Sequence, residues 1–266
     1  MTSQAQKAHR FQALHRGEPF VIPNPWDAGS ARALAALGFQ ALASTSSGFA
    51  FTLGRLDGDV TLDEVVDHTT SIDRATDLPV SIDLENGYGD DPESAALAIT
   101  RAAGAGAVGG SIEDYDGKGR LYDREHAVER VAAAVEAARA LDFPFMLTAR
   151  AENHIRGNPN LDDTIGRLQA FEAAGADVLY APGLGTVDQI RAVCEAVLKP
   201  VNVLARRKLS MAEMVGAGAQ RISVGGALTW TAVSAMAQAA TAIRDDGDFS
   251  SLGVSPPLDD WFGRDA

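Results

Sequence analysis

Short apolar runs alternate with longer segments of helical period along almost the whole chain. A short run of β-branched and apolar residues is typical of a buried strand, whereas apolar residues every three or four positions predict an amphipathic helix. Eight such pairs follow one another in the sequence. The predicted strands cover residues 20–24, 41–45, 79–85, 107–113, 144–152, 177–183, 200–205 and 221–226, and each is followed by a predicted helix.

The number of these repeats favours one fold class over another. Eight strand–helix units match the (β/α)8 barrel better than an open doubly wound sheet, which has fewer strands and a glycine-rich fingerprint after the first one. No GxGxxG motif follows the first predicted strand here. We therefore predict a single (β/α)8 TIM barrel domain over residues 1–266, with residues 254–266 as a C-terminal tail.

Composition and charge narrow the class of protein further. The chain has 266 residues and a formal net charge of -13, and this negative field makes nucleic acid and membrane surfaces poor partners. The single cysteine, Cys194, excludes an internal disulfide, and no Cys/His spacing suggests zinc. No apolar stretch has the length of a signal peptide or a spanning helix, so we expect a cytoplasmic protein.

Acidic residues gather where the third and fourth predicted strands end. Asp83 and Glu85 lie two positions apart and would share one face of a strand, while Glu113 ends the next strand. Barrel enzymes place their sites at these carboxyl ends, and a divalent cation relieves the repulsion between neighbouring carboxylates. The pattern predicts a Mg²⁺ site, with Mn²⁺ as a possible substitute.

Two other interpretations of these acids remain open. Any one acid at a strand–helix junction can be a helix N-cap or a solvated loop charge. A calcium-binding loop from Asp114 to Glu125 matches poorly, because Lys118 and Tyr122 occupy two of its ligand positions. Three acids at adjacent strands favour the Mg²⁺ interpretation.

Four motifs, each at the expected strand end, resemble the isocitrate lyase/phosphoenolpyruvate mutase superfamily. The stretch "SSGFAFTLGRLDGD" is similar to the superfamily's loop after the second strand. The resemblance implies that the backbone amides of Ser47, Gly48 and Phe49 hold the substrate carboxylate, and that Asp57 is the loop aspartate.

The other three motifs concern the metal and the positive charge. "IDLENGYG" and "SIEDYDGKG" resemble the motifs of the magnesium site, which implies that Asp83, Glu85 and Glu113 form it. Asp83 also faces the substrate in this interpretation. "TARAENHIRG" resembles the fifth strand end, which makes Arg150 the cation that binds the substrate and stabilises an enolate.

Departures from the superfamily motifs leave the reaction open. The loop after the fourth strand reads "YDGKGRLYD" and lacks the cysteine of the lyases. Lys118 lies near the lysine of the mutases, but their asparagine and their sixth-strand histidine are absent. We predict Arg150, Asp57 and Lys118 as catalytic residues, with Glu152 and Tyr88 as further candidates for proton transfer.

The resemblance implies a Mg²⁺-dependent lyase that cleaves a carbon–carbon bond in a small 2-hydroxy or 2-oxo carboxylate through an enolate-like intermediate. A mutase or hydrolase acting on the carbon–phosphorus bond of a phosphonopyruvate-type substrate is the first alternative, and a non-catalytic carboxylate-binding barrel is the second. The resemblance also implies a homo-oligomer, a tetramer in which the eighth helix is swapped between subunits.

Overall fold

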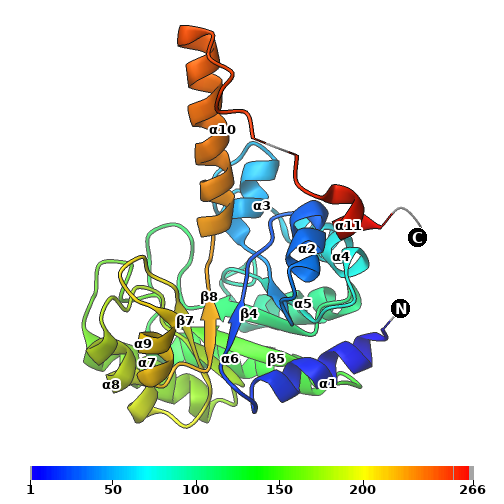
Figure 1. Cartoon of the computed structure of the whole chain (residues 1–266). Coiled ribbons are helices and arrows are strands. Elements are labelled where there is room, and N and C mark those ends of the chain that lie inside the picture. Colours follow the sequence, from blue (N-terminus) through cyan, green and yellow to red (C-terminus); the bar gives the residue numbers. More distant parts are fainter. Residues whose placement is uncertain (1, 254, 264–266) are drawn as a thin grey trace.

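The computed structural model describes residues 2–253 and 255–263, and it arranges them as a ring of parallel strands surrounded by helices (Figure 1). The strands are β1 (Phe20–Ile22), β2 (Leu42–Ala43), β3 (Val80–Asp83), β4 (Gly109–Glu113), β5 (Met146–Arg150), β6 (Val178–Tyr180), β7 (Val201–Leu204) and β8 (Arg221–Ser223). The helices are α1 (Gln4–Leu14), α2 (Ala28–Ala36), α3 (Ser46–Thr52), α4 (Leu62–Ala75), α5 (Pro92–Gly104), α6 (Arg124–Arg139), α7 (Leu161–Ala173), α8 (Val187–Ala196), α9 (Met211–Gly216), α10 (Ala227–Asp246) and α11 (Leu258–Phe262).

The eight strands form an α/β barrel. Their order is β1-β8-β7-β6-β5-β4-β3-β2, and every pair of hydrogen-bonded neighbours is parallel. The backbone N–H of Ala43 donates to the carbonyl of Pro23 at 3.1 Å, which joins the two ends of this series. The predicted TIM-like barrel is therefore confirmed, and all strands direct their carboxyl ends to one side.

The strands are shorter than predicted, because the chain turns immediately after each barrel layer. Strand β3 ends at Asp83, and Glu85 has a positive φ of 48°. The N–H of Gly87 then donates to the carbonyl of Leu84 at 2.7 Å. The prediction that Asp83 and Glu85 alternate within one strand is wrong, and Glu85 belongs to the turn.

Besides α11 in the predicted tail, two helices lie where the hydrophobic pattern predicted no element. Helix α1 covers the amino ends of the strands, because Ala8 and Phe11 are buried against Phe20 and Val178. Helix α3 begins in the region interpreted as a loop after the second strand. The Thr45 hydroxyl caps it by accepting from the N–H of Gly48. The first helix closes one end of the barrel, and the second shapes the opposite end.

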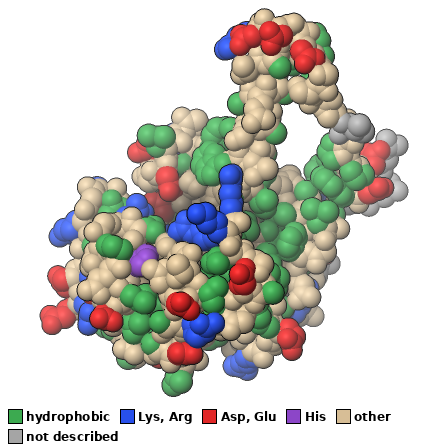
Figure 2. All heavy atoms as spheres, turned by 60° about the vertical axis from the view of Figure 1, so that its left-hand side comes forward, with side chains coloured by type: hydrophobic (Ala, Val, Ile, Leu, Met, Phe, Trp, Pro, Cys, Tyr) green, Lys and Arg blue, Asp and Glu red, His purple; other side chains and the backbone are tan. Residues whose placement is uncertain are grey.

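Helix α10 projects away from the barrel over most of its length (Figure 1). Of its 20 residues only Thr229 is buried, although the helix contains Trp230 and Met236, which are 43% and 61% exposed. Figure 2 shows this arm with acidic side chains at its tip. Within the described residues, no helix is both long and apolar enough to cross a membrane.

The C-terminal tail returns to the barrel surface. Helix α11 packs against α2, where Arg32 donates to the carbonyl of Phe262 at 3.2 Å. The tail thus covers a neighbouring surface of the same chain. Residues 254 and 264–266 of the predicted tail lie outside the described residues.

Candidate active site

A cavity of about 340 Å³ opens at the carboxyl ends of the strands. Its wall combines polar and charged groups from most strands of the barrel, because parallel strands present their last residues at the same end. The residues that matter for its chemistry are Ser46, Ser47, Asp57, Asp83, Arg150, Arg156, Tyr180, Asn202, Arg221 and Ser223.

The guanidinium of Arg150 lies at the centre of a group of carboxylates. It donates to Asp83 Oδ1 at 2.9 Å and to Glu152 Oε1 at 2.9 and 3.1 Å, and it lies 2.9 Å from Glu113 Oε2. Burial opposes the charge of this guanidinium, but the three carboxylates raise its pKa well above the ordinary value. Arg150 therefore stays charged, and most of its N–H donors contact protein carboxylates.

Strand pairing explains how this group forms. Glu113 at the end of β4 lies opposite Arg150 at the end of β5, and Asp83 pairs with Ser111 of β4. Burial raises the pKa of Glu113 well above its usual range, and the adjacent guanidinium of Arg150 opposes that rise. Residues far apart in the sequence thus meet because β3, β4 and β5 are neighbours.

The buried ion pair between Asp114 and Arg167 fixes the position of Glu152 beside Arg150. The backbone N–H of Glu152 donates to Asp114 Oδ1 at 2.7 Å, and Arg167 donates to the other oxygen of Asp114 at 2.9 Å. Burial raises the pKa of Asp114 to about 6 despite these two donors. Asp114 and Arg167 support the site from behind, where the chain passes out of β5.

Glu85 and Asp57 add negative charge beside Asp83. Burial and then the neighbouring Asp83 raise the pKa of Glu85 to about 8. Partial desolvation raises the pKa of Asp57 also, although the side chain of Ser46 donates a hydrogen bond to it. Among the described residues, Glu85 Oε1 is buried without a hydrogen-bond partner. The turn therefore concentrates carboxylates that no protein cation fully neutralises.

The arrangement can be compared directly with the predicted metal site. Within residues 2–253 and 255–263, no three His, Cys, Asp or Glu side chains are grouped closely enough to hold a metal ion together. In this arrangement Arg150 supplies the positive charge between Asp83 and Glu113. Carboxylate oxygens, including the Glu85 Oε1 that has no hydrogen-bond partner among the described residues, are the type of ligand that Mg²⁺ prefers. The metal site at these residues stays a prediction.

The structure separates the three residues predicted to hold the substrate carboxylate. Ser47 lines the cavity, whereas Gly48 and Phe49 do not. The N–H of Phe49 donates to the carbonyl of Thr45 at 3.0 Å, and its ring stacks on His68 at 3.9 Å. A Cβ on Gly48 would lie only 2.6 Å from Thr229 Oγ1, so glycine is needed there for helix packing.

Lys118 belongs to a neighbouring cavity of about 310 Å³. This second space is lined by Glu85, Glu113, Tyr88 and Lys118, and the loop around Lys118 is exposed. Asp57 and Arg150 do not line it, although both line the main cavity. Of the three predicted catalytic residues, Asp57 and Arg150 therefore line the same cavity, and Lys118 lines the neighbouring one.

Arg156 is a site residue that the sequence analysis missed. It lines the main cavity and pairs with Glu152 at 3.3 Å, and its guanidinium lies 4.0 Å from the centroid of the Tyr115 ring. The loop after the fourth strand thus touches the loop after the fifth. The quoted stretch "HIRG" contained this cation, but no periodic pattern shows where a loop side chain points.

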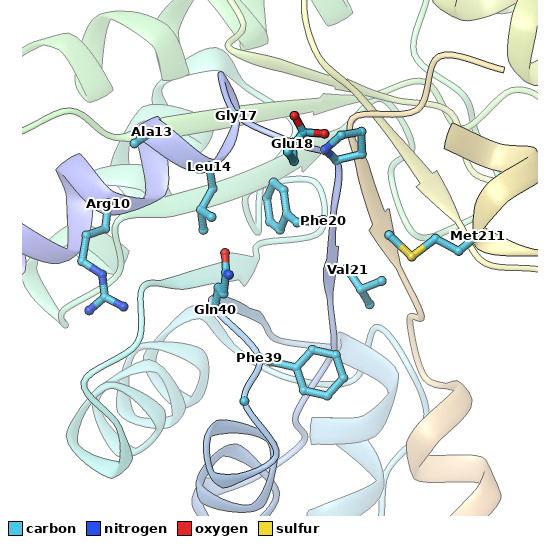
Figure 3. Close-up of a pocket in the computed structure, with 12 residues that line it drawn as sticks. Arg10, Ala13, Leu14, Gly17, Glu18, Phe20, Val21, Phe39, Gln40 and Met211 are labelled. Carbon is cyan, nitrogen blue, oxygen red and sulfur yellow. The ribbon is translucent and has the colours of Figure 1, made fainter. Parts of the chain in front are cut away.

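A larger hollow lies at the other end of the barrel. A groove of about 700 Å³ is lined by α1, β1 and residues 38–40, and Figure 3 shows Phe20, Val21, Phe39 and Met211 along it. Arg10 and Glu18 are its only charged side chains among the described lining residues. This groove offers no group of convergent polar residues, so the carboxyl end is the candidate active site.

Comparison with known proteins supports the same assignment. The family model described as phosphoenolpyruvate phosphomutase matches residues 11–244. The chain belongs to this family. A solved structure of the family's wider superfamily, 2,3-dimethylmalate lyase of the PEP mutase/isocitrate lyase superfamily, is 26% identical, with a TM-score of 0.87 and coverage of 100% of this chain and 96% of that one. The resemblance drawn from the four motifs is therefore confirmed, and the chain is an enzyme of this superfamily.

Nearer relatives of this family member leave its reaction undetermined. A structure from Burkholderia cenocepacia J2315, described only provisionally as a lyase/mutase, is 52% identical with a TM-score of 0.94 and covers 98% of this chain and 96% of its own. An oxaloacetate decarboxylase of Paraburkholderia xenovorans is 33% identical over 74% of this chain and 67% of its own. An uncharacterised protein of Mycobacterium tuberculosis is 30% identical over 87% of both chains.

Ligands are known for a more distant neighbour. The structure of a phosphonopyruvate hydrolase in complex with oxalate and Mg²⁺ has a TM-score of 0.84 and covers 97% of this chain and 92% of its own, at 22% identity. At this identity the likeness shows the shared fold alone. That neighbour is a hydrolase that binds oxalate and Mg²⁺, whereas the family and superfamily that include this chain are named for a mutase and for lyases.

Proposed function

We propose that the protein is a Mg²⁺-dependent lyase that cleaves a carbon–carbon bond in a small 2-hydroxy or 2-oxo carboxylate through an enolate-like intermediate. The observation that carries the proposal is the guanidinium of Arg150, held among Asp83, Glu113 and Glu152 in the wall of a polar cavity. Relatives named as oxaloacetate decarboxylase and 2,3-dimethylmalate lyase support this class of reaction.

Asp83, Glu85 and Glu113 are the residues that would hold the cation, either Mg²⁺ or Mn²⁺. When bound, it would act as a Lewis acid on the substrate's carboxylate and adjacent oxygen. Mg²⁺ commonly keeps several waters and takes only one or two carboxylates directly, so a compact cluster of three acids is not required. The raised pKa of Glu85, caused by burial and by Asp83, supports the need for a positive partner here.

Arg150 would stabilise the negative charge that develops on the substrate oxygen. Its planar guanidinium can bind two oxygens at once, and a preorganised donor of this kind is worth about 3 kcal/mol in the transition state. Ser47, at the start of α3, would hold the substrate carboxylate from the opposite side of the cavity, together with the amide of Gly48 if the Thr45 cap opens.

Asp57 is our first choice for the group that transfers a proton. It lines the main cavity, and partial desolvation together with the neighbouring Asp83 raises its pKa above the ordinary value of a carboxyl group. Lys118 is the second choice, because it lines the adjoining cavity beside Glu113. Substituting Asp57 by Asn should lower kcat and change KM much less. If Asp57 is the proton donor, Lys118→Met should not cause this selective loss of kcat.

Turnover assays on the purified protein test the proposal. The protein would be incubated with Mg²⁺ and oxaloacetate, 2-methylisocitrate or phosphonopyruvate, and the keto-acid products measured. Cleavage of either of the first two supports a carbon–carbon lyase, and turnover of phosphonopyruvate alone would replace it with carbon–phosphorus chemistry. No turnover of any of the three, combined with oxalate binding that does not depend on Mg²⁺ in calorimetry, would contradict the proposal.

We also propose that α10 is the contact between subunits. The helix is apolar and exposed, and an isolated apolar face of this length is stabilised by a second copy of the chain. Swapping of the helix within a homotetramer would bury Trp230 and Met236. Light scattering of the wild type should then give a tetramer, and Met236→Glu should give a smaller species; a monomeric wild type would contradict this assembly.

A further inference from the structure

A second buried guanidinium lies in the barrel below Arg150. Arg221 is the first residue of β8, and it is 5% exposed. Its Nε donates to Asn202 Oδ1 at 2.8 Å, and one Nη donates to Thr148 Oγ1 at 3.0 Å. The other Nη lies 3.2 Å from His15 Nε2. None of these three partners is a carboxylate.

The histidine that contacts Arg221 is uncharged. His15 Nδ1 is 2.8 Å from the carbonyl of Phe11, so Nδ1 carries the hydrogen and Nε2 is free to accept from Arg221. Burial, and then the charge of Arg221, lower the pKa of His15 to about 3. The imidazole is therefore neutral at physiological pH and acts as an acceptor.

Among the residues that the structure describes, no carboxylate balances the charge of Arg221. Burial lowers its pKa only to about 10, so the side chain is still protonated at neutral pH. Within the described part of the chain, Arg221 forms no ion pair with a carboxylate, in contrast to Arg150, which has three. A buried charge without an opposite partner is costly to maintain, and proteins normally pair it.

Arg221 lines the same cavity as Arg150. Asn202, Ser223 and Tyr180 lie beside it in that wall, and Asn202 Nδ2 donates to Ser223 Oγ at 3.0 Å. Thr148, which Arg221 contacts, precedes Arg150 by two residues on β5. Two residues of a strand span roughly 7 Å, so the position on β5 that Arg221 contacts lies about one barrel layer below that of Arg150. That spacing suits the two carboxylates of a short diacid.

We propose that Arg221, with Asn202 and Ser223, forms an anion-binding subsite at the bottom of the cavity that selects dicarboxylates over monocarboxylates. One end of the substrate would face Arg150, and the second carboxylate would neutralise Arg221. The choice of a carboxylate substrate rests on the proposed function, but the presence of an anion subsite does not.

A matched pair of ligands and an isosteric variant test this subsite. Malate and 2-hydroxybutyrate share a four-carbon chain and a 2-hydroxy carboxylate, and only malate has the distal carboxylate. Asn202→Asp places a carboxylate against Arg221 Nε without changing side-chain volume. In calorimetry with Mg²⁺, the wild type should bind malate at least about tenfold more tightly than 2-hydroxybutyrate, and N202D should lose this preference.

Two further experiments distinguish loss of the subsite from misfolding and from loss of catalysis. Arg221→Met should lose the same preference, Arg221→Lys should keep part of it, and circular dichroism would show that each variant is folded. In EDTA, malate should still raise the Tm of the wild type and not that of N202D. Equal malate shifts in both proteins, or none in either, would overturn the subsite, whereas failed turnover assays would overturn only the proposed lyase reaction.

Discussion

The two ends of the barrel differ more in chemistry than in size. The groove at the amino end is about twice as large as the cavity at the carboxyl end, 700 against 340 Å³, yet it is lined mainly by apolar side chains (Figure 3). The smaller cavity is lined by the guanidinium groups of Arg150 and Arg221 and by the carboxylates of Asp57 and Asp83. Charge that the fold keeps buried, and not empty volume, distinguishes the candidate active site.

The direction of the chain causes this difference. Every strand is parallel to its neighbours, so the turns that follow all of them meet at one end. At the other end, α1 packs Ala8 and Phe11 against the first residues of the strands and closes the barrel with apolar contacts. A substitution in the carboxyl-end cavity should therefore change activity, whereas one in the amino-end groove should not.

The largest effect is expected at Arg150. Arg150→Lys keeps the positive charge but loses the planar fork that holds Asp83, Glu113 and Glu152 and would bind the substrate, so kcat/KM should fall by about 10²- to 10³-fold. The matched control is Arg101→Lys on the surface of α5, which should have wild-type kinetics. Comparable activity of the two variants in the assay that detects wild-type turnover would remove the distinction between the two ends.

A pH effect should be localised to His15, at the closed end. Because burial lowers the pKa of His15 to about 3, the unfolded chain takes up this proton near pH 6.5 and the folded chain does so only near pH 3. The free energy of unfolding should therefore decrease as the pH falls, by about 2 kcal/mol from this group between pH 6.5 and 5. Gln cannot titrate but can accept from Arg221, so urea denaturation of His15→Gln should show a flatter acid limb; parallel curves would contradict this assignment.

A smaller loss of stability is expected at the rim of the cavity. Gly48→Ala would place a Cβ within 2.6 Å of both Thr229 Oγ1 and Thr45 Cγ2, and within 2.9 Å of Trp26 Cβ. This overpacking should lower the free energy of unfolding by at least about 1 kcal/mol. Gly104→Ala in α5, which would meet no atom within 4 Å, is the control and should be neutral or stabilising. Equal denaturation midpoints for the two variants would show that the rim tolerates a side chain.

The smallest effect is expected in the large groove. Met211 is 45% exposed on the wall of that groove, so Met211→Ser should change the free energy of unfolding by no more than about 0.5 kcal/mol and leave turnover unchanged. Denaturant titration and the turnover assay would measure both. A marked loss of activity would mean that the larger hollow takes part in function after all.

The main acids could be predicted because each lies at the end of a strand that the hydrophobic pattern reveals, whereas Arg150 was predicted from the resemblance of its motif to the superfamily. In the structure, β3, β4 and β5 are neighbours, and their pairing brings Asp83, Glu113 and Arg150 to the same end of the barrel. Glu85 was predicted to lie within the third strand, but it lies in the turn that follows β3 and has a positive φ. Helix α3 was missed because its seven residues are too few to show a helical period.

The sequence by itself determined the alternation of strands and helices, the barrel class and the acids at the strand ends, because these depend on local periodicity and strand order. Only the tertiary structure decided that Arg150 is surrounded by three carboxylates, that Arg221 has none among the described residues, and that Arg156 lines the cavity. The pairing of a buried charge depends on side chains from distant strands, and that information lies in the packing of the folded barrel.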